Sequence, residues 1–276
     1  MSPPRWTKSI ASALPDLSLR LIAALIALPF ALLFVYLGGA WGALLLLILG
    51  LVAGWEFFHM MTVGGYHPAR WAGLPWLTAI WLSLLRPNLM PLSFVLAIGL
   101  IGTMAISLFT RNRPADTWFS TVTGSIYLGI ALGMTALLRT SAYGMWWLYF
   151  ALLTAWANDT MAYFVGVFWG AHKLWPRVSP KKTWEGSIGG WVGAALMALL
   201  FAWFSPIPLR PLPALIIGVL VGVLALIGDL TISMLKRQVG VKDSGRIFPG
   251  HGGVLDRMDS LLFVVPVVYM IVATFF

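Results

Sequence analysis

Long apolar runs, separated by short polar stretches, repeat along the whole chain. The runs occupy residues 20–38, 41–61, 71–86, 90–109, 119–138, 145–168, 188–205, 211–233 and 260–276. Most are close to the roughly 20 residues that a helix needs to cross a membrane, and none shows the alternation of a membrane barrel strand. The pattern predicts an all-α integral membrane protein, a polytopic bundle of about nine transmembrane helices. The run at 71–86 is short and contains Pro75, so the sequence leaves open whether it spans completely.

The amino-acid composition excludes an ordinary soluble domain. Hydrophobic residues make up 60% of the chain and charged residues only 10%, against about 25% charged in soluble proteins. There is no cysteine, which excludes disulfides and thiolate metal sites. Basic cytoplasmic loops and anionic lipid headgroups explain the formal net charge of +9, so we expect no nucleic-acid partner. The first apolar run has no small-residue cleavage site followed by polar sequence, and we expect it to remain as a span.

Lysine and arginine are distributed unevenly between alternate loops. If the N-terminus lies in the cytoplasm, 15 of the 18 basic residues fall on the cytoplasmic side, and only Arg86, Arg139 and Arg210 fall outside. The positive-inside rule favours this orientation, which puts the polar 233–259 stretch in the cytoplasm. The chain has no long linker or low-complexity segment. We therefore predict one domain over residues 1–276, with 1–150 mainly as scaffold.

The densest polar stretch runs from Ser233 to Asp259. Asp229, Ser233 and Lys236 follow one another at intervals of four and three residues, so they form a stripe on one helix face. Asp256 and Asp259 are three residues apart at the expected start of the last helix, again on one face. Two carboxylates with phosphate oxygens and water are typical ligands of Mg²⁺ at phosphoryl-transfer sites. Acids for a metal, interleaved with bases for phosphates, indicate nucleotide or phospholipid chemistry.

The loop between these acids combines glycines with basic side chains. Its Pro-Gly-His-Gly-Gly sequence can bend sharply and bring backbone N–H groups toward an anion. His251, within this sequence, could act as a base, a phosphate donor or an ordinary loop residue. Positive charge for phosphate groups comes from Lys236, Arg237, Lys242, Arg246 and Arg257.

A second polar cluster extends from Trp156 to Gly190. Asp159 lies within an apolar run, where an unpaired carboxylate costs a few kcal/mol. Gly166 and Gly170 continue its helix face with small surfaces that allow close packing. The following loop carries the polar residues His172, Lys173, Arg177, Ser179, Lys181, Lys182, Thr183 and Glu185. The alternatives are a loop that only contacts lipid headgroups, and acids that only form structural ion pairs.

Glu56 is an isolated acid in the second apolar run. His59 follows three residues later, at helical spacing, so a local cap or ion pair is one interpretation. A functional role is the other, and the sequence does not decide between them.

The polar residues resemble the signature of a known family, the CDP-diacylglycerol synthases or phosphatidate cytidylyltransferases. The resemblance rests first on Ser233, Lys236, Arg237, Lys242, Asp243, Gly245, Pro249, His251, Gly252, Gly253, Asp256, Arg257 and Asp259. It extends upstream to the Asn158-Asp159-Thr160 and Gly228-Asp229 sequences and to residues 179–186. The similarity covers residues 155–260, whereas the first 150 residues match only as a series of apolar helices.

The resemblance implies transfer of the cytidylyl group from CTP to phosphatidate, with CDP-diacylglycerol and pyrophosphate as products. It implies a requirement for Mg²⁺, leaves open a second cation such as K⁺, and implies a homodimer among membrane lipids. We then expect the protein in a bacterial cytoplasmic (inner) membrane, with its active-site loops facing the cytoplasm. The preference between CTP and dCTP and the acyl-chain preference are not determined by the sequence.

Residue roles follow from the same resemblance. Residues 151–276 are then the catalytic part of the domain. The expected catalytic residues are Asp229, Lys236, Asp256 and Asp259. Asp229 and Asp256 are expected to bind Mg²⁺, with Asp259 and Asp159 completing or supporting the metal site. The expected contacts to CTP and phosphatidate are Ser233, Arg237, Lys242, Asp243, His251 and Arg257, together with Lys181, Lys182, Thr183 and Glu185 from the second cluster.

Other functions are compatible with parts of the pattern. A secondary transporter or channel for an anionic solute would also use charges within spans, and the similar spacings from Asp159 to Glu185 and from Asp229 to Asp256 faintly echo a repeat. A transporter, however, needs polar residues along a path across the membrane, whereas here they gather at one side. The acid arrangement of CDP-alcohol phosphotransferases is absent from the sequence, and a lipid kinase is the remaining alternative.

Overall fold

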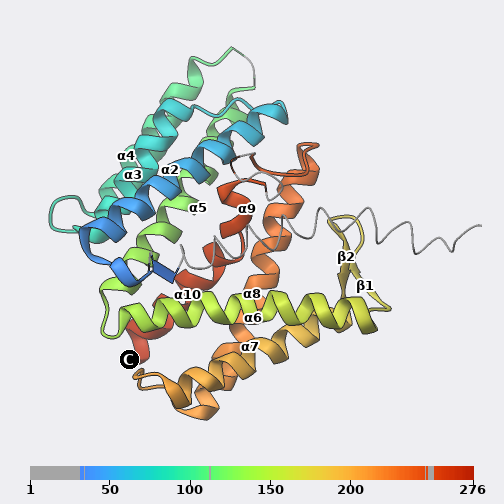
Figure 1. The fold of residues 1–276 in the computed structure, drawn as a ribbon. Coiled ribbons are helices and arrows are strands. Elements are labelled where there is room, and N and C mark those ends of the chain that lie inside the picture. The colour runs from blue at the N-terminus through green and yellow to red at the C-terminus, as the bar shows by residue number, and fades with distance from the viewer. Residues whose placement is uncertain (1–31, 34, 112, 246, 248–251) are drawn as a thin grey trace, which may run out of the picture.

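The structure is a computed structural model that describes residues 32–33, 35–111, 113–245, 247 and 252–276. Its helices are α2 (Gly39–Val63), α3 (Arg70–Leu85), α4 (Leu92–Leu108), α5 (Pro114–Thr140), α6 (Gly144–Trp169), α7 (Trp184–Phe204), α8 (Pro211–Gln238), α9 (Val254–Met258) and α10 (Leu261–Phe275). Strands β1 (Lys173–Trp175) and β2 (Ser179–Thr183) lie between α6 and α7. Figure 1 shows α6 and α7 side by side, with the two strands at the end of α6. The fold is mostly helical, as predicted.

The all-α prediction is wrong for the segment between α6 and α7, which forms an antiparallel hairpin. Lys173 pairs with Thr183, and Trp175 pairs with Ser179. Strands of three and five residues are too short to give a recognisable alternating pattern, and no apolar face marks them in this polar loop. The hairpin matters for the site because it carries the lysines of the second polar cluster.

Several helices are long and apolar enough to cross a membrane. By length and composition these are α2, α5, α7 and α8, and α4 and α10 are shorter apolar helices. The chain is therefore an integral membrane protein with several apolar spans. Helix α3 has 16 residues and contains Pro75, so it extends about 24 Å, less than the roughly 30 Å of the hydrocarbon core. The first predicted run, 20–38, lies largely outside the described residues.

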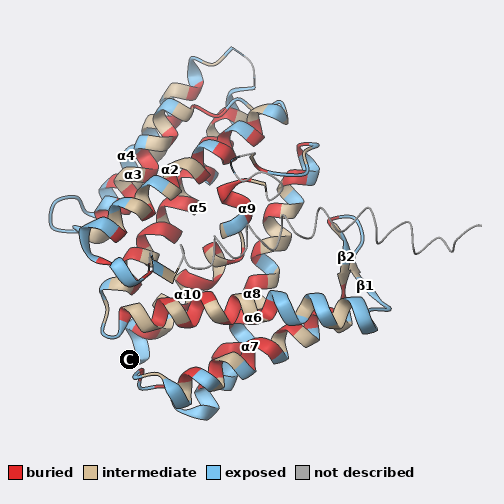
Figure 2. Ribbon diagram, viewed as in Figure 1, coloured by how far each residue is buried: buried red, intermediate tan, exposed pale blue. Residues whose placement is uncertain are grey.

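The buried side chains form two main hydrophobic clusters, seen as the buried segments in Figure 2. The first is built by α6, α7, α8 and α10, and includes Phe150, Val221 and Val264. The second is built chiefly by α2, α3, α5 and α9, and α8 and α10 reach it through Ile232 and Leu262. Helices α8 and α10 thus join the two groups of helices. The polar residues described below lie on or next to these two helices.

The last predicted helix is divided in two. The sequence spacing puts Asp256 and Asp259 together at the start of one helix, but α9 ends at Met258 and α10 begins at Leu261. Asp259 is the C-cap of α9, and Ser260 is the N-cap of α10. The two acids therefore do not lie on one continuous helix, and each has its own partners.

Candidate active site

Asp229 on α8 is the point where the two polar clusters meet. The ammonium group of Lys182, on strand β2, forms an ion pair with Asp229 Oδ2. Ser233, one turn further along α8, donates from its Oγ to Asp229 Oδ1 over 3.2 Å, which confirms that the predicted stripe shares one helix face. The Lys182 and Asp229 side chains are 26% and 29% exposed, so the pair remains accessible from outside the protein. The ion pair brings the hairpin and the α8 segment together.

Asp259 comes close to Asp229 through a backbone contact at Gly228. A Cβ atom on Gly228 would lie 2.6 Å from the carbonyl oxygen of Asp259 and 3.0 Å from Ser260 Cα, so only glycine permits this approach. The pKa of Asp259 is raised to about 8, first by burial and then by the nearby carboxylates of Asp229 and Asp159. The carboxylates of Asp229 and Asp159 therefore both disfavour the charged form of Asp259, and a bound cation would relieve this repulsion.

Asp159 reaches this group from α6. Its Oδ1 accepts a hydrogen bond from Asn158 Nδ2 over 3.0 Å. Asn158 is buried against α7, where a Cβ atom on Gly190 would lie 2.7 Å from Asn158 Oδ1. The predicted close packing of this helix is confirmed further along, where a Cβ atom on Gly186 of α7 would lie 3.1 Å from Gly166 Cα. Small residues therefore hold α6 against α7 and fix the position of Asp159.

Both carboxylate oxygens of Asp256 accept hydrogen bonds from other groups of the protein. Its Oδ1 accepts from Lys236 Nζ over 2.7 Å. Its Oδ2 accepts from the backbone N–H groups of Ser244 and Gly253, over 2.8 and 3.0 Å. Burial alone would raise the pKa of Asp256, but the Gly253 hydrogen bond and the Lys236 ammonium group outweigh it and lower the pKa below its usual value. The Gly253 N–H group, which the sequence predicts to approach an anion, thus binds an internal carboxylate.

The acids around Gly228 supply the oxygen ligands that Mg²⁺ prefers. Among the residues that the structure describes, no three metal-binding side chains lie close enough to hold an ion by themselves. Mg²⁺ usually takes only one or two carboxylates, and waters and substrate phosphates complete its coordination. Asp229 and Asp259, which the Gly228 contact brings together, fit such a site. The metal role of Asp256 stays a prediction, because both of its oxygens have protein partners here.

Thr183 and Glu185 fasten the hairpin to the start of α7. Thr183 Oγ1 accepts the N–H group of Gly186 over 3.1 Å and caps the helix. The Glu185 carboxylate accepts the backbone N–H groups of Ala171 and His172 over 3.2 Å, and it contacts His172 Nδ1 at 2.5 Å. These bonds fix the lysine that pairs with α8. A direct contact of either residue with nucleotide stays a prediction.

The remaining predicted substrate contacts are exposed or lie outside the described residues. The exposed residues are Lys181, Arg237, Lys242, Asp243 and Arg257. Their exposure leaves the basic groups accessible to phosphate groups of an incoming substrate. His251 lies outside the described residues. Its role, like the roles of the exposed residues, stays a prediction.

Glu56 on α2 lies next to the same site, and the sequence does not predict this. It accepts hydrogen bonds from Ser244, Val254 and Leu255, whereas His59 is exposed. The interpretation of Glu56 as a local cap or partner of His59 is therefore wrong. The one signal in the sequence was an acid in the middle of an apolar run.

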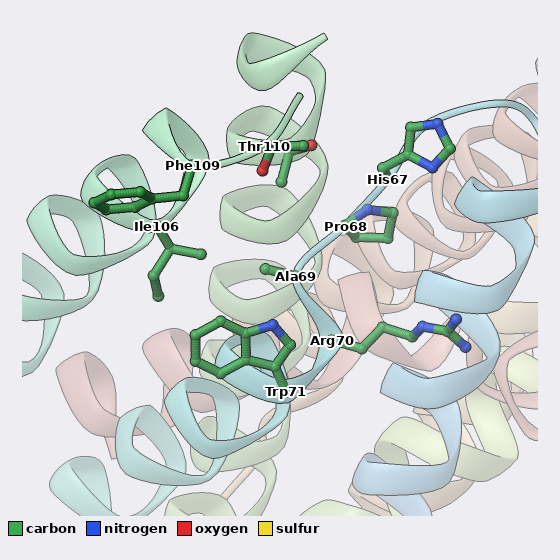
Figure 3. Close-up of a pocket in the computed structure, with 9 residues that line it drawn as sticks. His67, Pro68, Ala69, Arg70, Trp71, Ile106, Phe109 and Thr110 are labelled. Carbon is green, nitrogen blue, oxygen red and sulfur yellow. The ribbon is translucent and has the colours of Figure 1, made fainter. Parts of the chain in front are cut away.

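A cavity of about 500 Å³ lies at the ends of α3, α4 and α5 (Figure 3). Trp71, Ile106 and Phe109 form its apolar wall. Arg70 also borders it, but its guanidinium group stacks over the Trp55 ring at 4.9 Å. None of the acids described above lines this cavity, so it is separate from their site.

The fold and the site define a class: an integral membrane protein that gathers carboxylates and basic groups at one polar centre, as phosphate chemistry requires. Residues 18–275 match the model of the Cytidylyltransferase family. The chain belongs to this family.

Three relatives, each named phosphatidate cytidylyltransferase, are similar over nearly their whole length. The protein of Bacillus subtilis (strain 168) is 35% identical over 274 residues, which cover 94% of this chain and 99% of the relative. That of Staphylococcus haemolyticus (strain JCSC1435) is 34% identical over 261 residues, covering 91% and 96%. That of Brucella abortus biovar 1 (strain 9-941) is 34% identical over 263 residues, covering 94% of both chains. The similarity includes the N-terminal helices as well as the polar clusters.

Proposed function

We propose that the protein transfers the cytidylyl group of CTP to phosphatidate and produces CDP-diacylglycerol and pyrophosphate. Membership of the Cytidylyltransferase family and the names of the full-length relatives support this proposal. The structural observation that carries it is the meeting of Asp229 with Asp259 and Lys182. Carboxylates for a metal and a lysine for phosphate then stand at one place, as in-line transfer between two phosphate compounds requires.

In the proposed reaction, a phosphate oxygen of phosphatidate attacks the α-phosphorus of CTP. The bond from that phosphorus to the bridging oxygen of the β-phosphate breaks, and pyrophosphate leaves with the bonding electrons. The nucleophile is already anionic, so no side chain has to act as a strong base. The task of the protein is to position both substrates and to neutralise charge, which is how phosphoryl-transfer enzymes generally act.

The acidic residues divide into two roles in this proposal. Asp229 and Asp259 would hold Mg²⁺, and Asp159 would support it or bind a second cation such as K⁺, since one Mg²⁺ needs only one or two carboxylates. When bound, Mg²⁺ neutralises negative charge on the phosphates of CTP. Asp256 keeps Lys236 in place through their 2.7 Å contact. Direct coordination of Mg²⁺ by Asp256 is the alternative role of this residue in the proposal.

The basic residues hold the substrates. We assign the nucleotide phosphates to Lys182 and Lys236, whose ammonium groups already lie at carboxylates of the site. Exposed side chains, with Ser233 on α8, supply the further contacts to CTP and phosphatidate: Lys181, Arg237, Lys242, Asp243 and Arg257. These assignments account for the mixture of acids and bases without requiring a covalent intermediate.

The orientation in the membrane is part of the same proposal. About nine crossings with a cytoplasmic N-terminus put the polar site at the cytoplasmic face of a bacterial inner membrane, where CTP is available. Phosphatidate would arrive from the bilayer itself. A homodimer is proposed from family resemblance alone.

The decisive experiment uses the purified full-length protein in lipid vesicles with labelled CTP, phosphatidate and Mg²⁺. We expect pyrophosphate release that depends on the lipid, and we expect it to disappear with a chelator and to return with Mg²⁺. Asp259→Asn should abolish most of this turnover while the protein remains folded. Folded wild-type protein that releases no pyrophosphate with phosphatidate would refute the proposed function.

A further inference from the structure

Glu56 of α2 is buried and accepts three hydrogen bonds from the polar segment near the other end of the chain. Its exposure is only 3%. Glu56 Oε1 accepts the N–H group of Val254 over 3.1 Å, and Oε2 accepts that of Leu255 over 2.8 Å. Oε2 also accepts the hydroxyl group of Ser244 over 3.2 Å. All three described partners are donors, so the carboxylate acts only as an acceptor.

These bonds hold the start of α9. Val254 and Leu255 are the first two residues of that helix, whose first N–H groups have no partner within the helix. Glu56 satisfies both of them, and Asp256 satisfies the N–H group of Gly253 over 3.0 Å. A helix of five residues is too short to be stable without such contacts. The position of α9 therefore depends on a carboxylate that α2 supplies.

Ser244 lies at the start of the loop that leads to α9, and it links the carboxylates of Glu56 and Asp256. Its hydroxyl group binds Glu56, and its backbone N–H group binds Asp256 over 2.8 Å. Residues on both sides of the loop, at 244 and at 253–255, are thus fixed to the same pair of acids. The loop backbone also comes very close to Glu56, because a Cβ atom on Gly245 or Gly253 would collide with its carboxylate.

We propose that Glu56 is a positioning residue for the active site. By holding the start of α9, Glu56 fixes Asp256 against Lys236 and fixes Asp259, just beyond α9, beside Asp229. The N-terminal helices then do more than form a scaffold, because one of them supplies an anchor for the metal-binding acids. The expected effect of Glu56 on Mg²⁺ binding and turnover rests on the proposed function, whereas the effect of Glu56 on the position of α9 does not.

Glu56→Gln tests this with a minimal change in shape. A glutamine has one acceptor oxygen and one NH₂ group, which cannot accept a hydrogen bond from an N–H donor. Whichever way the amide turns, either Val254 or Leu255 loses its partner. The loss of one buried hydrogen bond corresponds to a change of roughly 5- to 150-fold in a local equilibrium.

The first measurement is amide hydrogen exchange of the metal-free protein in detergent. We expect exchange at the start of α9 to become about 5- to 150-fold faster in Glu56→Gln, while exchange in α6 and α7 stays unchanged. The second measurement is the Mg²⁺ concentration for half-maximal pyrophosphate release. We expect it to rise at least about fivefold, with part of the lost turnover restored at high Mg²⁺. A purely structural role would lower the amount of folded protein without this shift.

Thr62→Val is the matched control, because the Thr62 hydroxyl group also lies on α2 but binds only within its helix, to the Phe58 carbonyl oxygen over 2.8 Å. It should match the wild-type protein in both measurements. Ser244→Ala removes one bond to Glu56 and should produce the same changes more weakly. In the double variant, Ser244→Ala should add little to the effects of Glu56→Gln, because the two residues contact each other.

Three outcomes would overturn the proposal. One is unchanged exchange at α9 in Glu56→Gln. Another is faster exchange with an unchanged Mg²⁺ requirement in an enzyme that turns over. If Glu56→Gln does not fold, Ser244→Ala decides, and wild-type behaviour of that variant would count against the proposal. If the wild-type protein has no lipid-dependent turnover, the proposed function fails, and the exchange measurement still tests the anchor.

Discussion

Replacing Gly228 by alanine tests whether the backbone contact between α8 and the α9–α10 junction sets the geometry of the site. The added Cβ atom would lie 2.6 Å from the Asp259 carbonyl oxygen, and ordinary contacts begin at 3.4 Å, so the junction must move by 3.4 − 2.6 = 0.8 Å. Overpacking of this kind costs about 1–3 kcal/mol of folding free energy. A displacement near 1 Å at a reacting centre can reduce the rate about 10²-fold. We therefore expect a modest loss of stability and a large loss of activity.

The assay is kcat/KM for lipid-dependent pyrophosphate release, together with thermal unfolding in the same detergent. Gly102→Ala is the control, because Gly102 lies within α4 and a Cβ atom there would meet nothing within 4 Å. Alanine at this half-buried helical position, where the added methyl group meets open space, should leave activity unchanged. The reasoning is refuted if Gly228→Ala keeps kcat/KM within twofold of the wild-type value, or if Gly102→Ala loses as much activity.

Three further changes probe the charges of the site. Lys182→Met removes the partner of Asp229, and we expect kcat/KM to fall about 10²-fold with little change in thermal unfolding, because the pair is partly exposed. Asp256→Asn leaves the Lys236 charge buried without its partner, which should cost about 3–5 kcal/mol of folding free energy, measured by thermal unfolding. Since the pKa of Asp259 is raised to about 8, Mg²⁺ must displace a proton below that pH. The half-saturating Mg²⁺ concentration should therefore fall as pH rises from 7 to 8, and level off above it.

Each of these changes has its own control. Lys173→Met, on the other strand of the hairpin, should keep near-normal activity, and an equal loss there would contradict the role of Lys182. Asp116→Asn breaks a more exposed ion pair with Arg113, 2.7 Å long, and should affect stability far less than Asp256→Asn. A Mg²⁺ requirement that does not change between pH 7 and pH 9 would contradict the assignment of Asp259.

The sequence predicts those features of the fold that depend on local periodicity. Apolar runs of membrane length indicated the long helices α2, α5, α7 and α8. Intervals of four and three residues along α8 put Asp229, Ser233 and Lys236 on one face, and the structure confirms that Ser233 bonds to Asp229. The small residues of α6 likewise indicated close packing, and in the structure α7 is the helix that packs there. In each case the informative residues lie within one continuous stretch of the sequence.

The features that the sequence did not predict depend on distant contacts or on very short elements. Ser244 and Glu56 are 188 residues apart, so no local pattern connects them. The strands of the hairpin have only three and five residues, and α9 has five. The spacing of Asp256 and Asp259 suggested one helix for both acids, but α9 ends at Met258, before Asp259. The sequence predicts that backbone N–H groups of the glycine-rich loop approach an anion. For Gly253 that anion is the carboxylate of Asp256.

The contact between Glu56 and α9 has a consequence for biosynthesis. Glu56 and Leu255 are separated by 199 residues, so at about 5–20 residues per second Glu56 is synthesised roughly 10–40 s before its partners. During that time the Glu56 side chain of α2 lacks its final donors, and water must hydrogen-bond to it in the membrane. The site is therefore completed only after the last helices have been inserted. A protein truncated before residue 254 would contain most of the spans but could not bind nucleotide and metal in the arrangement proposed above.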